Sequence, residues 1–529
     1  MGLPRLVEDL LDPRAYPDRP ASVQLRQTHI SYIFLTPEHA YKVKKPVDFG
    51  FLDFTTIEKR RHFCAEELRL NRRLTEGVYL DVVPITEWNG GHRVGGGGKG
   101  GDGGGGPVEY AVKMTRLPDA SMLNVLVERG LADADVIRRV AARIAAFHAS
   151  AETGEDISGF GAPEAIGKNA EENFSQTLDQ RGVALSGALF EKIRSYTRAF
   201  LEERRGLFNE RVEGGFIRDC HGDMHCDHIS ITDGINIFDC IEFNERFRFS
   251  DVASDVAFLS MDLDFRNRAD LSRTLVEEYF RITGDRAGPG LLDFYKCYRA
   301  YVRGKVDGFK CSEPEVPEDE RMAALVSARM HYHLSGLYAG GGFRPMLVVV
   351  CGLPGTGKST VAGTLAAHTS MVRISSDAVR KELAGIPPGS HAPSGYGRGI
   401  YTPEFTEKTY GEMTGRARAL LAEGRSVVVE ATFSGRDHLR RAARAAEGQG
   451  AEFRVVECTA PDGLVRERLT ARKDEAPAPG EAVSDADWAI YLEQKKLQGP
   501  SIRGPGRISV DTSSGAGAAV MEIAREIFA

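Results

Sequence analysis

The pattern of apolar and polar residues changes along the chain, and its first part is typical of strands. SVQLRQTHISYIFLTPEHAYKVKKPV predicts two strands with a turn at Thr36-Pro37-Glu38. TTIEKRRHFCAEELRLNRRL instead has helical periodicity, with a Thr cap and a glutamate three residues after Thr55. YLDVVPITEWNG and PVEYAVKMTRL predict two more strands. Residues 21–115 are therefore expected to be strand-rich with one helix.

A glycine tract, GGHRVGGGGKGGDGGGGP, separates the last two of these strands at residues 90–107. Such a composition cannot bury apolar surface and favours a flexible hairpin tip. We expect it to be an insertion without a function of its own.

The pattern then becomes mostly helical over residues 116–335, with a strand-and-loop interruption at 216–245. ADVIRRVAARIAAFHAS is a clear amphipathic helix. Residues 336–345 are expected to form a linker. From residue 346 to 529 strands alternate with helices, as in a parallel sheet with crossover helices. With residues 1–115 as a first lobe, the sequence predicts a multidomain protein of α+β and α/β class.

Composition adds few constraints to this picture. The chain has 529 residues, too many for one hydrophobic core, and a net charge of −7 that gives no general attraction to polyanions. The eight cysteines form no CxxC pair, which favours reduced thiols. The first thirty residues have no apolar segment of the kind found in signal peptides, so we expect a cytoplasmic protein without a membrane partner.

One segment has the complete pattern of a phosphate-binding loop. GLPGTGKST (352–360) matches G-x-x-x-x-G-K-[ST] and follows the apolar strand MLVVVC. In such loops backbone N–H groups wrap phosphate oxygens, and the next helix points its positive N-terminus at them. Lys358 should reach the outer phosphates of ATP, and the Ser359 hydroxyl should bind Mg²⁺. The predicted nucleotide-binding residues are Gly352, Gly355, Thr356, Gly357, Lys358, Ser359 and Thr360.

Charged residues downstream of this loop suit phosphoryl transfer. In ISSDAVRKEL, Asp377 ends a predicted strand and Arg380 follows one helical turn later. A carboxylate there can accept a proton from an attacking hydroxyl, and an arginine can hold an acidic group. Asp377 could also simply cap the helix. Glu430, at the end of the strand VVVEATF, has the position of an acidic group that serves magnesium or its water.

A second group of charges precedes a Pro/Gly-rich stretch. LVRERLTARKDEAPAPGEAVSD contains Arg466, Arg468 and Arg472, which fit a mobile lid that brings arginine to the transferred phosphoryl group. A solvated helix face is the alternative.

These motifs resemble those of the zeta-toxin, gluconate-kinase and polynucleotide-kinase group of P-loop kinases. The resemblance covers about residues 346–515 and rests on GLPGTGKST, SSDAVR, VVVEATF and ERLTARK. It implies ATP-dependent phosphorylation of a hydroxyl group, with Asp377 as substrate base, Arg380 as substrate clamp and Arg468 or Arg472 as lid arginine. Sugar acids, nucleotide sugars and RNA ends are all substrates within the group, so no substrate is implied.

A second polar cluster, HGDMHCDH, occupies residues 221–228. Its three histidines have i,i+4 and i,i+3 spacings that could bind a metal on a helix. Gly222 and the strand-like segments on both sides favour a loop instead. A phosphotransferase loop needs a catalytic base, a magnesium ligand and then a magnesium-binding aspartate after a hairpin. Asp223, His228 and Asp239 occur in this order and are predicted to fill these roles.

This cluster resembles the aminoglycoside phosphotransferase and choline kinase family, whose loop begins HGD. The resemblance covers about residues 20–335, and His228 stands where the related kinase motif has Asn. It implies a bilobal protein-kinase-like fold, in which Asp255, with Asp251, anchors the loop. A strand lysine and a helix glutamate should hold ATP. AYKVKKP places Lys42 and Lys44 on one face of a strand, and CAEELRLNRRL offers Glu66 and Glu67; Lys44 and Glu67 are favoured.

The sequence thus predicts a bifunctional phosphotransferase that uses ATP and Mg²⁺ to phosphorylate hydroxyl groups of small molecules. The order of the two domains also resembles a family of predicted bifunctional bacterial kinases. Two alternatives stay open: a non-catalytic first domain that senses a ligand and regulates the second, or an enzyme that processes RNA ends. The second alternative would use the basic segment RDHLRRAAR at 436–444, which could equally be a solvated helix face.

Overall fold

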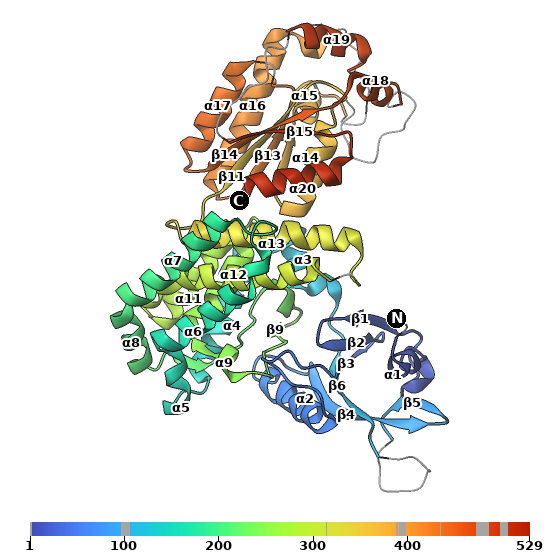
Figure 1. Ribbon diagram of the computed structural model, residues 1–529, viewed down its shortest axis with the longest axis vertical. Coiled ribbons are helices and arrows are strands. Elements are labelled where there is room, and N and C mark those ends of the chain that lie inside the picture. The colour runs from blue at the N-terminus through green and yellow to red at the C-terminus, as the bar shows by residue number, and fades with distance from the viewer. Residues whose placement is uncertain are drawn as a thin grey trace. The chain divides into compact units, whose positions relative to one another are not determined.

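The computed structural model describes residues 3–96, 106–313, 315–387, 390, 398–433, 435–471, 486–497 and 506–528 (Figure 1). The chain forms two compact units that are discontinuous in sequence. Unit 1 consists of Met1–Gly167, Leu201–Asp262 and Thr274–Leu292, and unit 2 consists of Lys168–Phe200, Leu263–Arg273 and Asp293–Ala529. Among the described helices, we find none with the length and apolar character that a membrane crossing requires.

Unit 1 contains a six-stranded antiparallel sheet. Its strand order is β1 (Gln24–Gln27), β2 (Ser31–Leu35), β3 (His39–Lys44), β6 (Glu109–Thr115), β4 (Tyr79–Trp88) and β5 (Gly91–Val94).

The predicted turn at 36–38 joins β2 and β3. The first predicted strand is in fact two, because the Thr28 hydroxyl accepts the backbone N–H groups of Ile30 and Ser31 and turns the chain.

One helix, α2 (Ile57–Asn71), packs on this sheet through an apolar cluster that includes Cys64 and Val112. A threonine caps this helix as predicted, but it is Thr56 and not Thr55: the Thr56 hydroxyl accepts the backbone N–H of Lys59 at 3.3 Å. The cap fixes where the helix starts, and its buried face therefore carries Glu67 toward β3.

The rest of unit 1 is mostly helical, with two small antiparallel strand pairs. The pairs are β7 (Ile217–Asp219) with β10 (Phe249–Asp251), and β8 (Ile229–Ile231) with β9 (Ile235–Ile237). They border the segment 221–228, so the predicted cluster lies in a loop, as Gly222 indicated. Helices that begin in this unit include α1 (Arg5–Asp9), α3 (Leu123–Glu128), α4 (Ala134–Ser150), α5 (Glu155–Ser158), α6 (Pro163–Gln176), α8 (Arg205–Glu213), α9 (Glu245–Arg248) and α10 (Val252–Phe265).

Unit 2 contains a five-stranded parallel sheet. Its order is β12 (Val372–Ser375), β13 (Val427–Glu430), β11 (Met346–Cys351), β14 (Glu452–Thr459) and β15 (Arg507–Asp511). The central strand β11 is buried at every position, as a strand covered on both faces must be.

Helices cover both faces of this parallel sheet (Figure 1). α14 (Lys358–Thr369) and α20 (Ala516–Ile527) pack on one face, and α15 (Ser376–Leu383), α16 (Pro403–Ala422) and α17 (Arg436–Glu447) pack on the other. The remaining helices are α7 (Gly187–Glu203), α11 (Ala269–Thr283), α12 (Leu292–Cys311), α13 (Glu318–Tyr338), α18 (Asp462–Ala471) and α19 (Trp488–Leu497). α13 continues into the first residues of the expected linker.

These elements confirm the predicted fold class. The strand-rich segment with one helix, followed by a helical region with an inserted strand-and-loop segment, is the predicted kinase-like order. The C-terminal parallel sheet with its loop after β11 is the predicted P-loop domain. Half of the glycine tract, residues 97–105, lies outside the described residues. Its first residues form β5, which pairs with β4, so this part of the tract is a strand and not the expected flexible tip.

Candidate active sites

Four buried charges from three separate segments form the first candidate site, in unit 1. We call Lys42, Lys44, Glu67 and Glu242 the lysine–glutamate cluster. Glu67 binds both lysines, with Oε1 2.9 Å from Lys42 Nζ and Oε2 2.7 Å from Lys44 Nζ. The two lysines therefore lie on one face of β3, and Glu67 rather than Glu66 meets them; Glu66 pairs with Arg69.

The two lysines differ in their second partner. Lys42 also binds Oδ1 of Asp239, whereas Lys44 also binds Glu242 and lies over the Phe54 ring. The Lys44 side chain is 0 % exposed, and the Lys42 side chain is 9 % exposed. Lys42 is thus the lysine that faces the predicted metal ligand, while Lys44 is enclosed by carboxylates and an aromatic ring.

The protonation of this cluster follows from mutual neutralisation. Burial alone would raise the pKa of Glu67, but the ammonium groups of Lys42 and Lys44 lower it below its ordinary value. Burial alone would lower the pKa of Lys42, but Asp239 and Glu67 raise it well above normal. The pKa of Glu242 is raised, chiefly by burial. We infer charged lysines, each held by a carboxylate.

Asp239 follows β9 and has a left-handed backbone, with φ of 64°. This conformation is uncommon for a residue with a Cβ and occurs often at functional sites. Its N–H donates to the Tyr79 hydroxyl at 3.2 Å. Burial raises the pKa of Asp239, but the ammonium group of Lys42 outweighs it, so the pKa lies below its ordinary value. Asp239 is therefore an anion whose side chain remains 38 % exposed.

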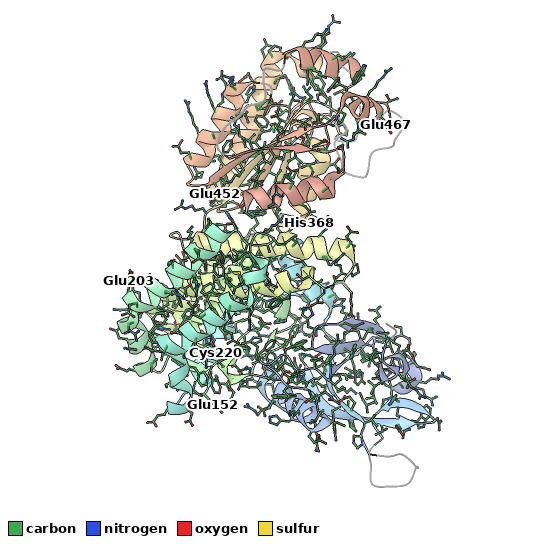
Figure 2. All side chains as sticks on the ribbon, in the orientation of Figure 1. Glu152, Glu203, Cys220, His368, Glu452 and Glu467 are labelled. Atoms are coloured by element: carbon green, nitrogen blue, oxygen red, sulfur yellow. The ribbon has the colours of Figure 1, made fainter. Side chains whose placement is uncertain are left out.

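The histidine loop, residues 221–228, begins with an anchor. Asp255 on α10 accepts the backbone N–H groups of His221 at 2.7 Å and Gly222 at 3.0 Å, as predicted for a loop anchor. Asp251 instead binds Arg211. Gly222 has φ of 85°, and a Cβ there would lie 2.8 Å from the Phe247 carbonyl oxygen, so glycine is required. Figure 2 marks Cys220, the residue just before this loop.

His221 connects the loop to the Asp239 segment. Its Nε2 lies 2.9 Å from the Phe238 carbonyl oxygen, and its Nδ1 accepts the Asp223 N–H at 3.2 Å. This pattern fits the Nε2–H tautomer. Burial lowers the pKa of His221 to about 4, so the ring is neutral near pH 7. We infer that His221 positions the loop and does not itself transfer protons.

The remaining residues of the loop bring carboxylates and imidazoles together. His228 Nε2 lies 3.5 Å from Asp239 Oδ2, and His228 Nδ1 lies 3.5 Å from Asp223 Oδ2. His225 Nε2 lies 3.6 Å from Asp223 Oδ2. Burial lowers the pKa of His228, and the neighbouring His225 lowers it further. The three predicted residues Asp223, His228 and Asp239 thus lie side by side, and His225 joins them.

The second candidate site, in unit 2, is the P-loop between β11 and α14. Gly352, Gly355 and Gly357 have φ of 136°, 76° and 83°, which explains the glycines. A Cβ on Gly352 would lie 2.4 Å from the Cys458 carbonyl oxygen. Lys358 Nζ binds the Leu353 carbonyl oxygen at 2.9 Å. Ser359 and Thr360 are exposed in the first turn of α14, where their hydroxyl groups can be reached by a ligand.

An arginine from α18 lies beside the P-loop. Arg468 donates to the hydroxyl of Thr512 at 2.9 Å and to its carbonyl oxygen at 2.7 Å. The Thr512 hydroxyl in turn donates to the Thr356 carbonyl oxygen at 2.9 Å. Arg468 is therefore linked through Thr512 to the P-loop, and its role as a lid arginine stays a prediction. Arg472, the other predicted lid arginine, lies outside the described residues.

Asp377 and Arg380 lie near each other on α15. Ser375 occupies the N-cap position of this helix without a side-chain capping hydrogen bond, so Asp377 is not the N-cap. The Arg380 guanidinium lies 4.9 Å from the Tyr401 ring centre, and its NH1 binds the Ile400 carbonyl oxygen at 2.5 Å. Burial raises the pKa of Tyr410 to about 12. The charge of Arg380 lowers this pKa and the charge of Asp377 raises it, so both charges act on the Tyr410 hydroxyl.

Glu430 lies at the end of β13, next to Val350 of β11, as predicted. It is 3 % exposed and binds Arg373, with Oε1 2.5 Å from NH2 and 3.2 Å from Nε. Its carboxylate is therefore already neutralised by a guanidinium, and a role toward magnesium stays a prediction.

Two of these residues, Glu242 and Thr512, were not predicted from the sequence. Glu242 follows Asp239 by three positions, and a charge inside the apolar segment FDCIEF was the available signal. Thr512 directly follows β15, and the available signal was the alternating RISV pattern of that strand. Neither residue belongs to a local motif. Glu242 contacts Lys44 and Thr512 contacts Thr356, and both partners lie far away in the sequence.

The chain is similar in sequence to one protein-family model and to proteins of mycobacteria. A family model described as "AAA domain" matches residues 347–493, from β11 to α19. The uncharacterized protein Rv2004c of Mycobacterium tuberculosis H37Rv is 32% identical over 481 residues, which are 90% of each chain. The uncharacterized protein Mb2027c of Mycobacterium bovis matches to the same extent.

The chain belongs to the family of these mycobacterial proteins. Because the match covers nine-tenths of both chains, the similarity extends well beyond the P-loop domain.

Solved structures with similar folds are more distant. A gluconokinase from Sinorhizobium meliloti 1021 is 20% identical with a TM-score of 0.25, and the match covers 35% of this chain and 92% of that one. A choline/ethanolamine kinase family protein from Mesorhizobium loti is 13% identical with a TM-score of 0.36, and the match covers 62% of this chain and 97% of that one.

Proposed function

We propose that the protein is a bifunctional ATP-dependent phosphotransferase, with one site in each unit and a hydroxyl-bearing small molecule as the acceptor at each. The observation that carries this proposal is the continuous row Lys42–Asp239–His228–Asp223 in unit 1. A phosphate-binding cation, a metal-binding carboxylate and a candidate base follow one another there, as phosphoryl transfer requires.

In unit 1 we assign phosphate binding to Lys42 rather than to Lys44. Lys42 contacts Asp239, where a metal–phosphate group would lie, whereas Lys44 is fully enclosed by Glu67, Glu242 and Phe54. Lys44 then acts as a positioning residue, because it joins Glu242, three residues after Asp239, to Glu67 on α2.

Asp223 is the proposed base of unit 1. Its carboxylate is 33 % exposed and lies beside two imidazoles, so it can meet an acceptor hydroxyl and take its proton. The carboxylate of Asp239 with its neighbour His228 fits a divalent cation, which would neutralise charge on the phosphates when bound. Lys42 would hold the phosphates in line with the hydroxyl.

In unit 2 the P-loop amides, Lys358 and Ser359 are the proposed ATP and magnesium ligands. Arg468, held by Thr512 beside the loop, would stabilise charge on the transferred phosphoryl group. Asp377 would accept the proton of the acceptor hydroxyl. Arg380 would hold an acidic group of the acceptor; its Nε is buried without a hydrogen-bond partner among the described residues.

A panel of metabolites and RNA 5′ ends with labelled ATP tests this proposal on wild type, Asp223→Ala and Lys358→Ala. We expect two classes of product, each lost in only one variant. If Lys358→Ala loses all transfer and Asp223→Ala loses none, unit 1 is a regulatory domain and the bifunctional proposal fails.

The same panel addresses RNA processing. On α17 two of the exposed arginines already have carboxylate partners, Arg440 with Asp437 at 3.2 Å and Arg441 with Glu407 at 2.7 Å. We therefore favour small-molecule acceptors. RNA binding that weakens steeply as salt rises, together with labelled RNA ends, would reverse this preference.

A further inference from the structure

We propose that the histidine loop of unit 1 binds a divalent transition-metal ion through an imidazole nitrogen, with Nε2 of His228 and the carboxylate of Asp239 as ligands. The inference deepens the proposed function, because this ion would serve the nucleotide phosphates there. Binding itself requires no turnover.

The hydrogen bonds of His228 orient its lone pair. Nδ1 lies 2.9 Å from the Asp223 carbonyl oxygen, which can only accept a hydrogen bond, so Nδ1 carries the proton. The lone pair of Nε2 then faces Asp239 Oδ2 at 3.5 Å. An imidazole lone pair and a carboxylate oxygen at this distance repel each other unless a cation lies between them. A carbonyl that fixes the tautomer in this way is typical of histidine ligands.

A second imidazole lies in the same place. One ligand atom from each of Asp223, His225 and His228 falls within 4.8 Å of the other two. His225 Nδ1 lies 3.3 Å from Asp227 Oδ2, while His225 Nε2 points at Asp223 Oδ2, 3.6 Å away. Ligand atoms around such an ion are about 3.0–3.4 Å apart, since each lies about 2.1 Å from the metal. His225 is thus in reach as a further ligand, with Asp227 beside its ring, while Asp223 stays the proposed base.

The chemistry of this donor set selects the class of ion. Magnesium prefers oxygen ligands and dehydrates reluctantly, whereas imidazole binds first-row transition metals well. Two imidazoles and the Asp239 carboxylate therefore favour such a metal over magnesium. The P-loop of unit 2 offers the contrast, because its predicted metal ligand is the Ser359 hydroxyl, and the neighbouring Glu430 is held by Arg373. The two sites of one chain would then use different metals.

Manganese is a suitable probe because its spin reports directly coordinated nitrogen. We would titrate full-length protein with MnCl₂ without nucleotide, in a Ser359→Ala background that removes the P-loop hydroxyl, and count bound ions by the loss of the free-ion EPR signal. Pulsed EPR would then measure ¹⁴N coupling. We expect one bound ion per chain with nitrogen coupling, displaced by about one equivalent of Zn²⁺ but not by a hundredfold excess of Mg²⁺.

Three variants test the assignment. His228→Asn should weaken Mn²⁺ binding at least about tenfold and remove or reduce the nitrogen coupling, whereas His225→Asn should reduce the coupling less. His92→Asn is the matched control, because His92 pairs with Asp9 at 2.7 Å outside the loop; it should change neither. Circular dichroism melting curves would verify that each variant is folded, and His228→Gln would replace an unfolded His228→Asn.

Manganese bound without nitrogen coupling, no binding below millimolar Mn²⁺, or coupling that survives His228→Asn together with His225→Asn would each overturn the proposal. These outcomes differ from failure of the proposed function. Asp223-dependent transfer with Mg²⁺ but no nitrogen coupling would refute only the metal assignment. Nitrogen-coupled Mn²⁺ without any Asp223-dependent transfer would refute only the activity.

Discussion

The two candidate sites are built in opposite ways. The P-loop is local: nine consecutive residues and their backbone conformation provide most of the predicted phosphate contacts. The site of unit 1 is assembled from side chains far apart in the sequence, since Lys42 and Asp239 are 197 residues apart and Lys44 and Glu242 are 198 apart. A local site depends on its own motif, whereas an assembled site depends on the buried charges that hold its parts in place.

The largest effect should come from separating the two sites. Asp223→Ala and Lys358→Ala should each lower one activity at least about 100-fold and leave the other unchanged, because each removes a group that acts directly on the reacting phosphate or hydroxyl. Initial rates with labelled ATP and the two acceptor classes measure this. Arg440→Gln, on the exposed face of α17, is the control and should leave both rates unaltered. Joint loss of both activities in either variant would show that the sites are not independent.

The second prediction distinguishes the two strand lysines. Lys44→Met leaves Glu242 and Glu67 buried without one of their cations, so it should lower the free energy of unfolding by about 3–5 kcal/mol. Lys42→Met should destabilise less, because Asp239 is partly exposed, but it should abolish transfer in unit 1. Urea unfolding and acceptor phosphorylation measure the two effects.

A double variant completes this test. Lys44→Met with Glu242→Gln removes both charges of one pair, and it should recover part of the lost stability. If the Lys44→Met protein is as stable as wild type but cannot bind ATP, Lys44 and not Lys42 binds the phosphates.

The third prediction uses pH to distinguish the units. Burial lowers the pKa of His221 to about 4, from an ordinary value of 6.5. Below pH 6.5 the unfolded chain therefore binds a proton that the folded chain does not, and stability falls as pH decreases toward 4, by about 3 kcal/mol in total. The pKa of His228 is lowered as well, which adds in the same direction.

Hydrogen exchange between pH 7.5 and 4.5 would locate this effect in the segments around 221–228. His221→Asn should flatten the pH dependence there, since its side chain has no titrating group. An unchanged slope in this variant would mean that another group is responsible.

The smallest effect concerns the P-loop. Thr512→Val removes the hydroxyl that joins Arg468 to the Thr356 carbonyl oxygen, so we expect the KM for ATP in unit 2 to rise about fivefold, as for one lost hydrogen bond. Ser513→Ala, at the next position, is the matched control. Equal effects of the two substitutions would argue against a specific role for Thr512.

The sequence predicted those parts of the structure that depend on local patterns. The P-loop, the strand before it and the turn at residues 36–38 followed from motif, hydrophobicity and turn chemistry. Glu67 was chosen correctly as the partner of the strand lysines, because it lies on the buried face of α2.

The parts that could not be predicted depend on distant partners. The spacing of Lys42 and Lys44 placed both on one face of β3, but only their contacts with Asp239 and Glu242 distinguish them. Glu430 was expected to face magnesium, and no local signal indicated that Arg373 on β12 would bind it. His225 was noticed only as part of the histidine spacing, and its approach to Asp223 depends on the folded loop.

The contact between Thr356 and Thr512 has a consequence for synthesis of the chain. The two residues are 156 positions apart, and β15, next to Thr512, forms the edge of the parallel sheet. On the ribosome the P-loop therefore emerges long before the residue that supports it. We expect nascent chains that stop before β15 to bind ATP poorly and to need chaperones, whereas the antiparallel sheet of unit 1, complete by residue 115, can form early.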